Sequence, residues 1–394
     1  MRIAQLSDSF LPIMDGVARV TLAYTETLCK MGHELTVIAP LCDTGPRGGY
    51  PFEIVDFKAL RLPLLKQYKT AEARWDKHYM ERIKMIPLDI VHTQSPFAAG
   101  TEALRLAVER NIPLVGMFHS KYEDDFVKAV HSRKIAHIGT KIVVNFYNRC
   151  DEVWTVSESS VDVMREYGYK GDVQVMLNGV SMKPVSPEKL NEVSARFDLG
   201  AAPVLLYVGQ LDWKKNLLNL ILAAAEMKKA GTDFRLVFAG QGINREEMEN
   251  KLKELDLMPY TRFTGHITEA DTLASLYQRA SVYAFPSLYD TASMTVREAA
   301  ALGTPSVMVK GATTASIVED GENGFLCENT PLDLARVMTK AVTDPEALKR
   351  AGDGARRTIS IPWEQTMEKA VRRYENLIEL GKRGKLKDKS KRLL

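Results

Sequence analysis

The sequence predicts an α/β protein with two doubly wound parallel sheets, one in each of two domains that face each other across a cleft. Short apolar segments alternate with helical segments along most of the chain, which is typical of parallel sheets covered by helices on both faces. The alternation breaks at Lys183–Pro187 and then starts again. A chain of 394 residues is too long for one comfortable core and about right for two domains.

Six segments in the first half are expected to be strands. The helix after the first of them is the clearest, because Val17, Val20, Tyr24, Leu28 and Met31 fall on one helical face and Gly32 is placed to end it. The expected strands are Arg2–Leu6, Leu35–Ala39, Asp89–Val91, Pro113–Phe118, Glu152–Val156 and Val173–Leu177, with further helices near Thr101–Arg110, Thr140–Arg149 and Ser157–Tyr167.

The second half repeats the pattern. We therefore expect a first domain at 1–184, a second at 185–362, a helix at 363–380 that packs back on the first domain, and a basic tail at 381–394. The expected strands are Val204–Val208, Phe234–Ala239, Arg262–Thr264, Val282–Phe285 and Ser306–Val309, with helices at Leu217–Lys229 and Arg245–Leu255.

Composition points to a cytoplasmic protein. The chain is 45% hydrophobic and 26% charged, and its four cysteines lack the spacing of a disulfide framework or a metal site. Neither a signal peptide nor an apolar run of membrane-spanning length is recognised. The tail holds seven Lys or Arg against one Asp. It is either a solvated, disordered end or an electrostatic tether to anionic lipid. No nucleic-acid partner is expected.

Two candidate binding elements follow expected strands of the first domain. Gly16 closes the loop Ser7–Gly16 at the start of a helix, where free amides suit an anion, although a plain tight turn explains one glycine equally simply. His119 ends the strand Pro113–Phe118, at the sheet edge where ligands bind. The alternative is a structural, hydrogen-bonded histidine, and the same choice applies to His92.

Two more candidates lie in the second domain. Lys215 lies in Gly209–Asn216, where a helix N-terminus and a cation together suit a diphosphate, unless the lysine is merely solvated. Asp290 lies in a loop, and Glu298 eight residues later is expected in the first turn of the next helix. Thr295–Glu298 is also a capping-box pattern, so Glu298 has the alternative role of capping its own helix. Ser293, Met294 and Thr295 would present unpaired amides at that helix start.

These segments resemble family 4 glycosyltransferases over roughly Met1 to Leu380. The strongest motif is Asp290-x7-Glu298 followed by Ala-Ala-Ala-Leu-Gly-Thr-Pro, which is similar to the family's Glu-x7-Glu signature and the helix after it. Supporting similarities are Gly16 with Gly32-His33-Glu34, Phe118-His119, Leu177–Val180, Gly209–Asn216, Asp320–Leu326 and Trp363. The resemblance implies the GT-B fold of two facing Rossmann-like domains, with the acceptor on the first and a nucleotide sugar on the second.

The resemblance also implies a role for each matching residue. Lys215 would neutralise the donor diphosphate, Asp290 would contact sugar hydroxyls, and Glu298 would bond the ribose. The remaining expectations are His119 near the reacting centre, Gly16 beside the diphosphate, His266 at the edge that holds the base, and Gln210, Ser293, Met294 and Thr295 around the phosphate and sugar. Where the family usually has Glu, Arg and Gly, this chain has Asp290, Gln210 and Ser293.

The implied reaction is retaining hexosyl transfer by front-face displacement, with UDP-glucose as the default donor and no metal or other cofactor. For the acceptor, the segment 57–74 carries five Lys or Arg against one Glu, interleaved with apolar residues. With the tail 381–394 this favours an anionic membrane surface, a peripheral inner-face location and a lipid acceptor such as diacylglycerol, for glycolipid biosynthesis. The alternatives are a soluble glycan or metabolite acceptor, a GT-B sugar-nucleotide epimerase, and a catalytically silent sugar-nucleotide-binding partner.

Overall fold

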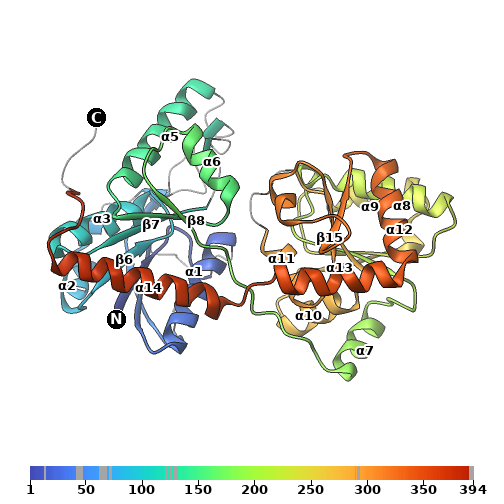
Figure 1. The fold of residues 1–394 in the computed structure, drawn as a ribbon, viewed down its shortest axis with the longest axis horizontal. Helices are drawn as coiled ribbons and strands as arrows, with labels where there is room; N and C mark the ends of the chain where they lie inside the picture. The colour runs from blue at the N-terminus through green and yellow to red at the C-terminus, as the bar shows by residue number, and fades with distance from the viewer. Residues whose placement is uncertain are drawn as a thin grey trace. The chain divides into compact units, whose positions relative to one another are not determined.

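A computed structural model describes residues 1–12, 15–40, 48–61, 69–70, 73–119, 122–123, 126–127, 132–288, 290 and 293–389. The chain divides into two compact units (Figure 1). Unit 1 is Met1–Asn178 with Trp363–Leu394, and unit 2 is Gly179–Pro362. Within the described ranges, no helix is both long enough and apolar enough to cross a membrane.

Unit 1 is built on a parallel sheet of seven described strands in the order β3-β2-β1-β6-β7-β8-β9. The strands are β1 (Arg2–Leu6), β2 (Glu34–Pro40), β3 (Glu53–Phe57), β6 (Ile90–Thr93), β7 (Leu114–Phe118), β8 (Glu152–Thr155) and β9 (Val173–Val175). The helices are α1 (Gly16–Lys30), α2 (Lys77–Met85), α3 (Ala98–Arg110), α5 (Arg133–Asn148), α6 (Glu158–Glu166) and α14 (Trp363–Lys382), with the 3-10 turn η1 (Ala73–Trp75).

Unit 2 has a parallel sheet of six described strands in the order β12-β11-β10-β13-β14-β15. The strands are β10 (Val204–Val208), β11 (Arg235–Ala239), β12 (Thr261–Gly265), β13 (Val282–Phe285), β14 (Ser306–Val309) and β15 (Gly324–Cys327). The helices are α7 (Pro187–Arg196), α8 (Leu217–Lys229), α9 (Arg245–Glu254), α10 (Ala270–Arg279), α11 (Met294–Ala301), α12 (Pro331–Thr343) and α13 (Pro345–Thr358). The 3-10 turns are η2 (Trp213–Lys215), η3 (Met258–Tyr260) and η4 (Thr313–Ile317). The prediction of two doubly wound parallel sheets is confirmed.

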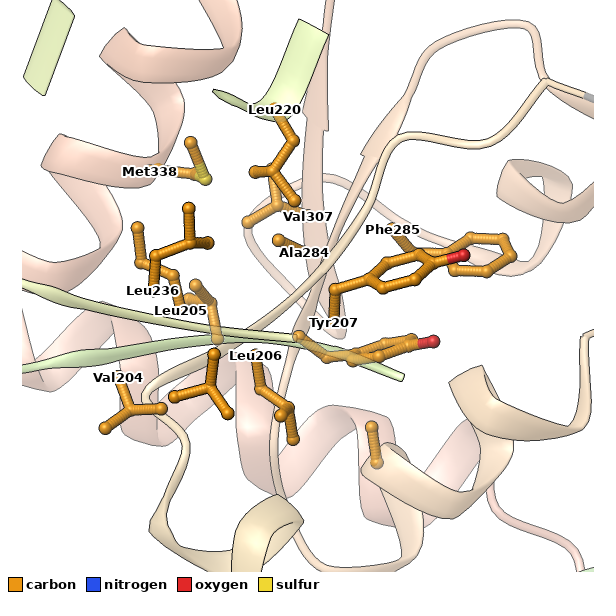
Figure 2. Packing of buried hydrophobic residues seen from close by; sticks show 14 of the residues in the cluster. Val204, Leu205, Leu206, Tyr207, Leu220, Leu236, Ala284, Phe285, Val307 and Met338 are labelled. Atoms are coloured by element: carbon orange, nitrogen blue, oxygen red, sulfur yellow. The ribbon is translucent and has the colours of Figure 1, made fainter. Parts of the chain in front are cut away.

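The core of unit 2 shows why its strands are apolar on both faces. Leu205 of β10 points toward Leu220 of α8 and Met338 of α12, whereas Val204 and Leu206 point to the other side of the sheet (Figure 2). All five side chains are fully buried. A central parallel strand therefore reads as a continuous apolar run and not as an alternation.

The division between the units differs from the one expected at 184/185. It falls after Asn178, because the Val180 N–H donates to the Ile361 carbonyl and Val180 forms a parallel bridge with Pro362. The Val185 N–H also donates to Gln278 Oε1 in unit 2. The irregular segment around Pro184 is therefore held by unit 2, and the helix α7 that follows it was not expected.

Helix α14 belongs to unit 1, where it lies beside α1 (Figure 1). Arg373 makes two hydrogen bonds to the Glu152 carboxylate, at 2.6 and 2.7 Å, and the Thr366 hydroxyl donates to the Leu177 carbonyl at 3.0 Å. The buried side chains of Trp363 and Tyr374 complete the contact. The last helix of the chain thus packs on the unit that contains the first strands.

The described part of the basic tail is also docked on unit 1. Lys389 is buried and its Nζ lies 2.7 Å from Asp151 Oδ2, while the Lys387 ammonium donates to the Cys150 carbonyl. The expectation of a disordered tail is therefore wrong up to Lys389. Lys382, Arg383 and Lys385 are nevertheless exposed, so contact of the tail with lipid stays a prediction, and residues 390–394 lie outside the described ranges. The amphipathic segment 57–74 is described only in part, with β4 (Leu60–Arg61) pairing antiparallel with β5 (Lys69–Thr70).

Gly240, directly after β11, provides a test of close backbone packing. Its φ is +146°, and a Cβ there would lie 1.9 Å from the Gly209 carbonyl oxygen. We expect Gly240→Ala to lower the free energy of unfolding by about 3–5 kcal/mol, from strain and overpacking together. The matched control is Gly231→Ala, which has a φ of +72° and open space around the new Cβ, so it should cost only about 1–2 kcal/mol. If urea unfolding shows that both variants lose the same free energy of unfolding, the predicted clash at Gly240 is contradicted.

Candidate functional site

In each unit, one strand marks the point where the chain reverses its direction of travel across the sheet. In unit 2 it is β10, which pairs with β11 on one side and β13 on the other. In unit 1 it is β1, between β2 and β6. Loops at the carboxyl ends of such strands diverge and leave room for a ligand. The candidate residues Lys215 and Asp290 follow β10 and β13, and Gly16 follows β1.

Lys215 and Asp290 form an ion pair in unit 2. The Lys215 ammonium donates to Asp290 Oδ1 at 2.7 Å, and the Ser287 hydroxyl donates to Asp290 Oδ2 at 2.5 Å. The side chains are only 13% and 24% exposed, so the pair is partly desolvated and is stronger than a typical surface pair. Two residues 75 positions apart in the chain are thereby brought into one site.

The backbone around Lys215 is held by local contacts. The Asp212 carboxylate accepts from the Lys214 N–H at 2.9 Å and so caps η2. Asn216 adopts the left-handed conformation with a φ of +61°, and its side-chain amide donates to the Pro286 carbonyl at 3.0 Å. This hydrogen bond connects the loop after β10 to the end of β13, and it fixes the position of the Lys215 backbone next to Asn216.

Glu298 does not act as a helix cap. Helix α11 begins at Met294 with Ser293 as its N-cap residue, so Glu298 lies in the second turn and not in the first turn as expected. The Glu298 carboxylate is buried and accepts from the Tyr277 hydroxyl at 2.9 Å. Thr295 is already inside the helix, and its hydroxyl accepts from Tyr283 at 2.6 Å. The capping-box interpretation is therefore wrong, and α10 instead supplies the partner that orients Glu298.

The amides at the start of α11 have no side-chain cap from Ser293. The Ser293 hydroxyl instead shares a 2.7 Å hydrogen bond with the Thr295 hydroxyl. The amides of Met294 and Thr295 thus lie at the positive end of α11, which follows Asp290 in the chain after β13. This end of the helix can accept an anion.

Gln210 and His266 are exposed and lie in the loops after β10 and β12. The Gln210 carbonyl accepts from the Tyr207 hydroxyl at 3.0 Å, and its side chain is exposed. His266 directly follows Gly265 at the end of β12 and is also exposed. Because β11 separates β12 from β10, the structure places His266 two strands from Lys215 and brings the two into no described hydrogen bond or ion pair.

Gly16 is the first residue of α1, and Asp15 caps this helix by accepting from the Ala18 N–H at 2.8 Å. A Cβ at Gly16 would meet nothing within 4 Å, and its φ is not positive. Neither packing among the described residues nor backbone conformation therefore requires glycine there. The simple tight-turn explanation therefore has no support in this part of the structure.

His119 heads a buried chain of hydrogen bonds in unit 1. Its Nε2 lies 2.7 Å from Gln94 Oε1, and the Gln94 amide donates to Gln5 Oε1 at 2.9 Å. Gln5 contacts the hydroxyl of Tyr374, which lies 2.6 Å from His92 Nδ1. Because the Gln94 amide donates to Gln5, its oxygen is left to accept from His119, which fixes the Nε2–H tautomer.

Burial keeps His92 and His119, the two histidines in this series of hydrogen bonds, neutral. It lowers the pKa of His119 to about 4 and that of His92 to about 3. His92 is fully buried among the rings of Tyr24, Trp154 and Tyr374, so its role is structural. His119 is only partly buried at the end of β7, and it is the member of the chain that can meet a ligand.

Sequence reasoning missed the residues that orient the candidates. They are Ser287 beside Asp290, Tyr277 beside Glu298, Tyr283 beside Thr295, and Gln94, Gln5 and Tyr374 behind His119. Gln94 alone had a readable signal, since it directly follows the strand β6 at the edge where ligands bind. Gly16 and His119 belong to unit 1, and the other candidates belong to unit 2.

Comparisons with known proteins agree with this fold. Residues 14–183 match a family model described as Glycosyltransferase Family 4, and residues 191–358 match one described as Glycosyl transferases group 1. HepE of Anabaena, in a structure that contains UDP, is similar with a TM-score of 0.76 at 16% identity, covering 95% of this chain and 100% of that one. The fold is therefore GT-B.

Curated relatives are similar over most of their length. An α-monoglucosyldiacylglycerol synthase of Streptococcus pneumoniae is 25% identical over 83% of this chain and 75% of its own. A GDP-mannose-dependent α-mannosyltransferase of Mycolicibacterium smegmatis is 27% identical over 97% of this chain and 99% of its own. The fold and these matches define an enzyme of the glycosyltransferase class. More particularly, the chain belongs to glycosyltransferase family 4.

The neutral histidines predict a pH dependence of stability. Each has a lower pKa when folded than its unfolded value of about 6.5, so the unfolded chain binds more protons as the pH falls. The contribution is fully present above pH ~6.5 and is lost as the pH falls toward 4, by up to about 1.4 kcal/mol per pH unit for each histidine. Urea unfolding followed by tryptophan fluorescence at pH 7 and pH 5 measures it, and three of the four tryptophans are in unit 1. His119→Gln should lose about 2 kcal/mol less between these pH values than the wild type; an identical loss would contradict the assignment.

Gln94 is expected to position His119. Gln94→Leu removes the acceptor for His119 and the donor to Gln5, so we expect a loss of about 1–3 kcal/mol in stability and a mixture of His119 tautomers. Gln94→Glu keeps an acceptor but adds a charge that raises the pKa of His119. Nitrogen-15 NMR of the histidine side chains distinguishes the tautomers. If both variants leave the His119 signals unchanged, Gln94 has no positioning role.

Proposed function

We propose that the protein transfers a hexose, with retention of configuration, from a nucleotide sugar to an acceptor hydroxyl, and that unit 2 holds the donor. The observation that carries the proposal is the ion pair of Lys215 and Asp290 at the reversal point of the unit 2 sheet. It unites a cation, a carboxylate and a helix N-terminus where a parallel sheet binds ligands. Glu298, four positions into α11 from Met294, completes the group.

Each group has a part that fits its surroundings. Lys215 and the first amides of α11 meet the diphosphate, whose charge grows as the sugar leaves. Glu298, oriented by Tyr277, accepts from ribose hydroxyls. Asp290 has both carboxylate oxygens bonded, so its position is fixed before the sugar arrives. Placement of these groups lowers the barrier without a separate pair of acid and base carboxylates.

In unit 1, Gly16 and His119 are proposed to face the diphosphate and the reacting sugar. Gly16 lets a ligand approach the amides of α1, and the neutral His119 offers Nδ1 as an acceptor, because its Nε2–H is engaged by Gln94. A neutral imidazole avoids placing a proton where the acceptor hydroxyl must lose one. The leaving phosphate oxygen is the proposed acceptor of that proton.

UDP-glucose is the proposed donor and diacylglycerol the proposed acceptor. The similarity to α-monoglucosyldiacylglycerol synthases of Streptococcus pneumoniae and Acholeplasma laidlawii supports this pairing. GDP-mannose is the second candidate, because the mannosyltransferases of Corynebacterium glutamicum and Mycolicibacterium smegmatis match nearly the whole chain. The loop with His266 after β12 is the proposed neighbour of the base and therefore the place where the two donors would be distinguished.

Nucleotide release across a panel of UDP-, GDP- and ADP-sugars, with and without vesicles that contain diacylglycerol, tests the proposal. Release that requires one donor and the lipid together supports the full proposal. Release with a sugar or metabolite in place of the lipid supports the donor site and rejects the lipid acceptor. Failure of every nucleotide sugar to bind, measured by calorimetry, would reject the donor site itself.

Lys215→Met should lower kcat/KM for the donor by about 10²–10³-fold, because one preorganised group that meets the growing diphosphate charge is removed. The matched control is Lys214→Met, which removes an adjacent lysine whose ammonium pairs with Asp212 at 3.2 Å and is 43% exposed. It should change kcat/KM only a few-fold. A similar loss in both variants would show a general effect of charge and not a contact of Lys215.

Gln210→Arg restores the cation that family 4 usually has at this position. The Gln210 side chain is exposed, so the longer arginine needs no space in the core. One charge-assisted hydrogen bond to the diphosphate should lower the dissociation constant of the nucleoside diphosphate about tenfold. Gln210→Glu, the opposite charge, should weaken binding in the same titration. An unchanged constant in both variants would place this loop away from the diphosphate.

A further inference from the structure

The outer face of α5 in unit 1 carries an apolar stripe that the protein does not bury. Ile135, Ile138 and Ile142 are 54%, 59% and 68% exposed and follow the i, i+3, i+7 spacing of one helical face. The opposite side of the helix packs inward through Ala136, Thr140, Val143 and Tyr147. Figure 1 shows α5 at the periphery of its unit, next to α6.

This clustering distinguishes α5 from the other helices. Large exposed hydrophobic side chains occur elsewhere among the described residues, but no other described helix carries more than one. Ile243 and Leu332 in unit 2, for example, are isolated, and single exposed apolar residues are ordinary. Three on one face, spaced over two turns, form a patch of the kind that marks an interaction surface.

The charge on the same helix indicates the partner. The sequence of α5, Arg133–Asn148, contains Arg133, Lys134 and Lys141 and no Asp or Glu. All three basic side chains are exposed. On a helical projection, Lys134 and Lys141 lie beside the isoleucine stripe, so their ammonium groups can reach lipid phosphates while the isoleucines enter the acyl boundary. Apolar residues flanked by cations are the pattern of a helix that lies in the plane of an anionic membrane.

We propose that α5 docks unit 1 on an anionic bilayer, with Ile135, Ile138 and Ile142 inserted and Lys134 and Lys141 against the headgroups. The tail is a weaker candidate up to Lys389, because Lys387 and Lys389 are engaged by Cys150 and Asp151. This membrane-docking surface is separate from the donor site. It would bring the enzyme to a lipid acceptor, as the proposed function requires. Vesicle binding is measured without donor or turnover, so the docking proposal and the proposed function can be rejected independently.

The test is co-sedimentation of the full-length protein with vesicles of phosphatidylcholine alone or mixed with phosphatidylglycerol. We expect binding to the mixed vesicles at low salt that weakens at about 0.5 M salt, where screening is nearly complete. Ile135→Ser, Ile138→Ser and Ile142→Ser together should reduce partitioning at least tenfold. Lys134→Gln with Lys141→Gln should reduce binding to the mixed vesicles by roughly tenfold or more, with little effect on phosphatidylcholine alone.

The matched control is Ile243→Ser with Leu332→Ser, which removes two side chains that are 87% and 69% exposed outside α5. It should bind vesicles as the wild type does. Because the three isoleucines are largely exposed, the melting temperature of the triple variant should stay close to that of the wild type. If it falls, Ile142→Ser alone, at the most exposed of the three positions, replaces the triple variant.

Three results would overturn the proposal. The first is a wild-type protein that does not bind the mixed vesicles at low salt. The second is a folded triple variant that partitions as the wild type does. The third is a wild-type dimer in light scattering that the triple variant converts to a monomer without any change in vesicle binding, since the stripe would then be a contact between two copies of the chain.

Discussion

The strand order of unit 2, with β10 between β11 and β13, is the constraint on which the candidate site depends. Parallel pairing aligns the carboxyl ends of β10 and β13, so the loops that follow them start side by side although their residues are far apart in sequence. The Asn216 amide then donates to the Pro286 carbonyl and so connects the loop after β10 to the end of β13. Next to it, the Lys215 ammonium pairs with the Asp290 carboxylate. Any other neighbour for β10 would separate the cation from the carboxylate.

Sequence alone predicted most of the strands and the loops that bear the candidate residues. The apolar runs of β10 and β13 are buried on both faces and therefore read clearly, while β15 was missed because Gly324–Cys327 is short and only half buried. The helix α7 was missed because two prolines near its start suggested irregular structure, although proline suits a first turn. The capping-box error at Glu298 has a similar local cause: the pattern makes Thr295 the N-cap residue, whereas the helix has its N-cap two residues earlier, at Ser293.

Contacts between distant segments could not be read from the sequence at all. The chain of hydrogen bonds behind His119 joins β1, β6, β7 and α14, and Gln5 and Tyr374 are 369 positions apart. Gln5 and Tyr374 in particular are unremarkable in their own segments. Only the closed unit reveals that they satisfy one another in a place from which water is excluded, and that this is why His119 is held in one orientation.

The return of the chain to unit 1 at Trp363 has a consequence for synthesis. Unit 2 is complete once Pro362 has left the ribosome, whereas unit 1 still lacks the helix that supplies Tyr374. Until that helix arrives, His92 and the aromatic rings around it form an open apolar surface on a sheet whose strands have all been made. The first unit to begin is therefore the last to finish, and for that interval the nascent chain depends on late residues, or on a chaperone, to keep this surface from other molecules.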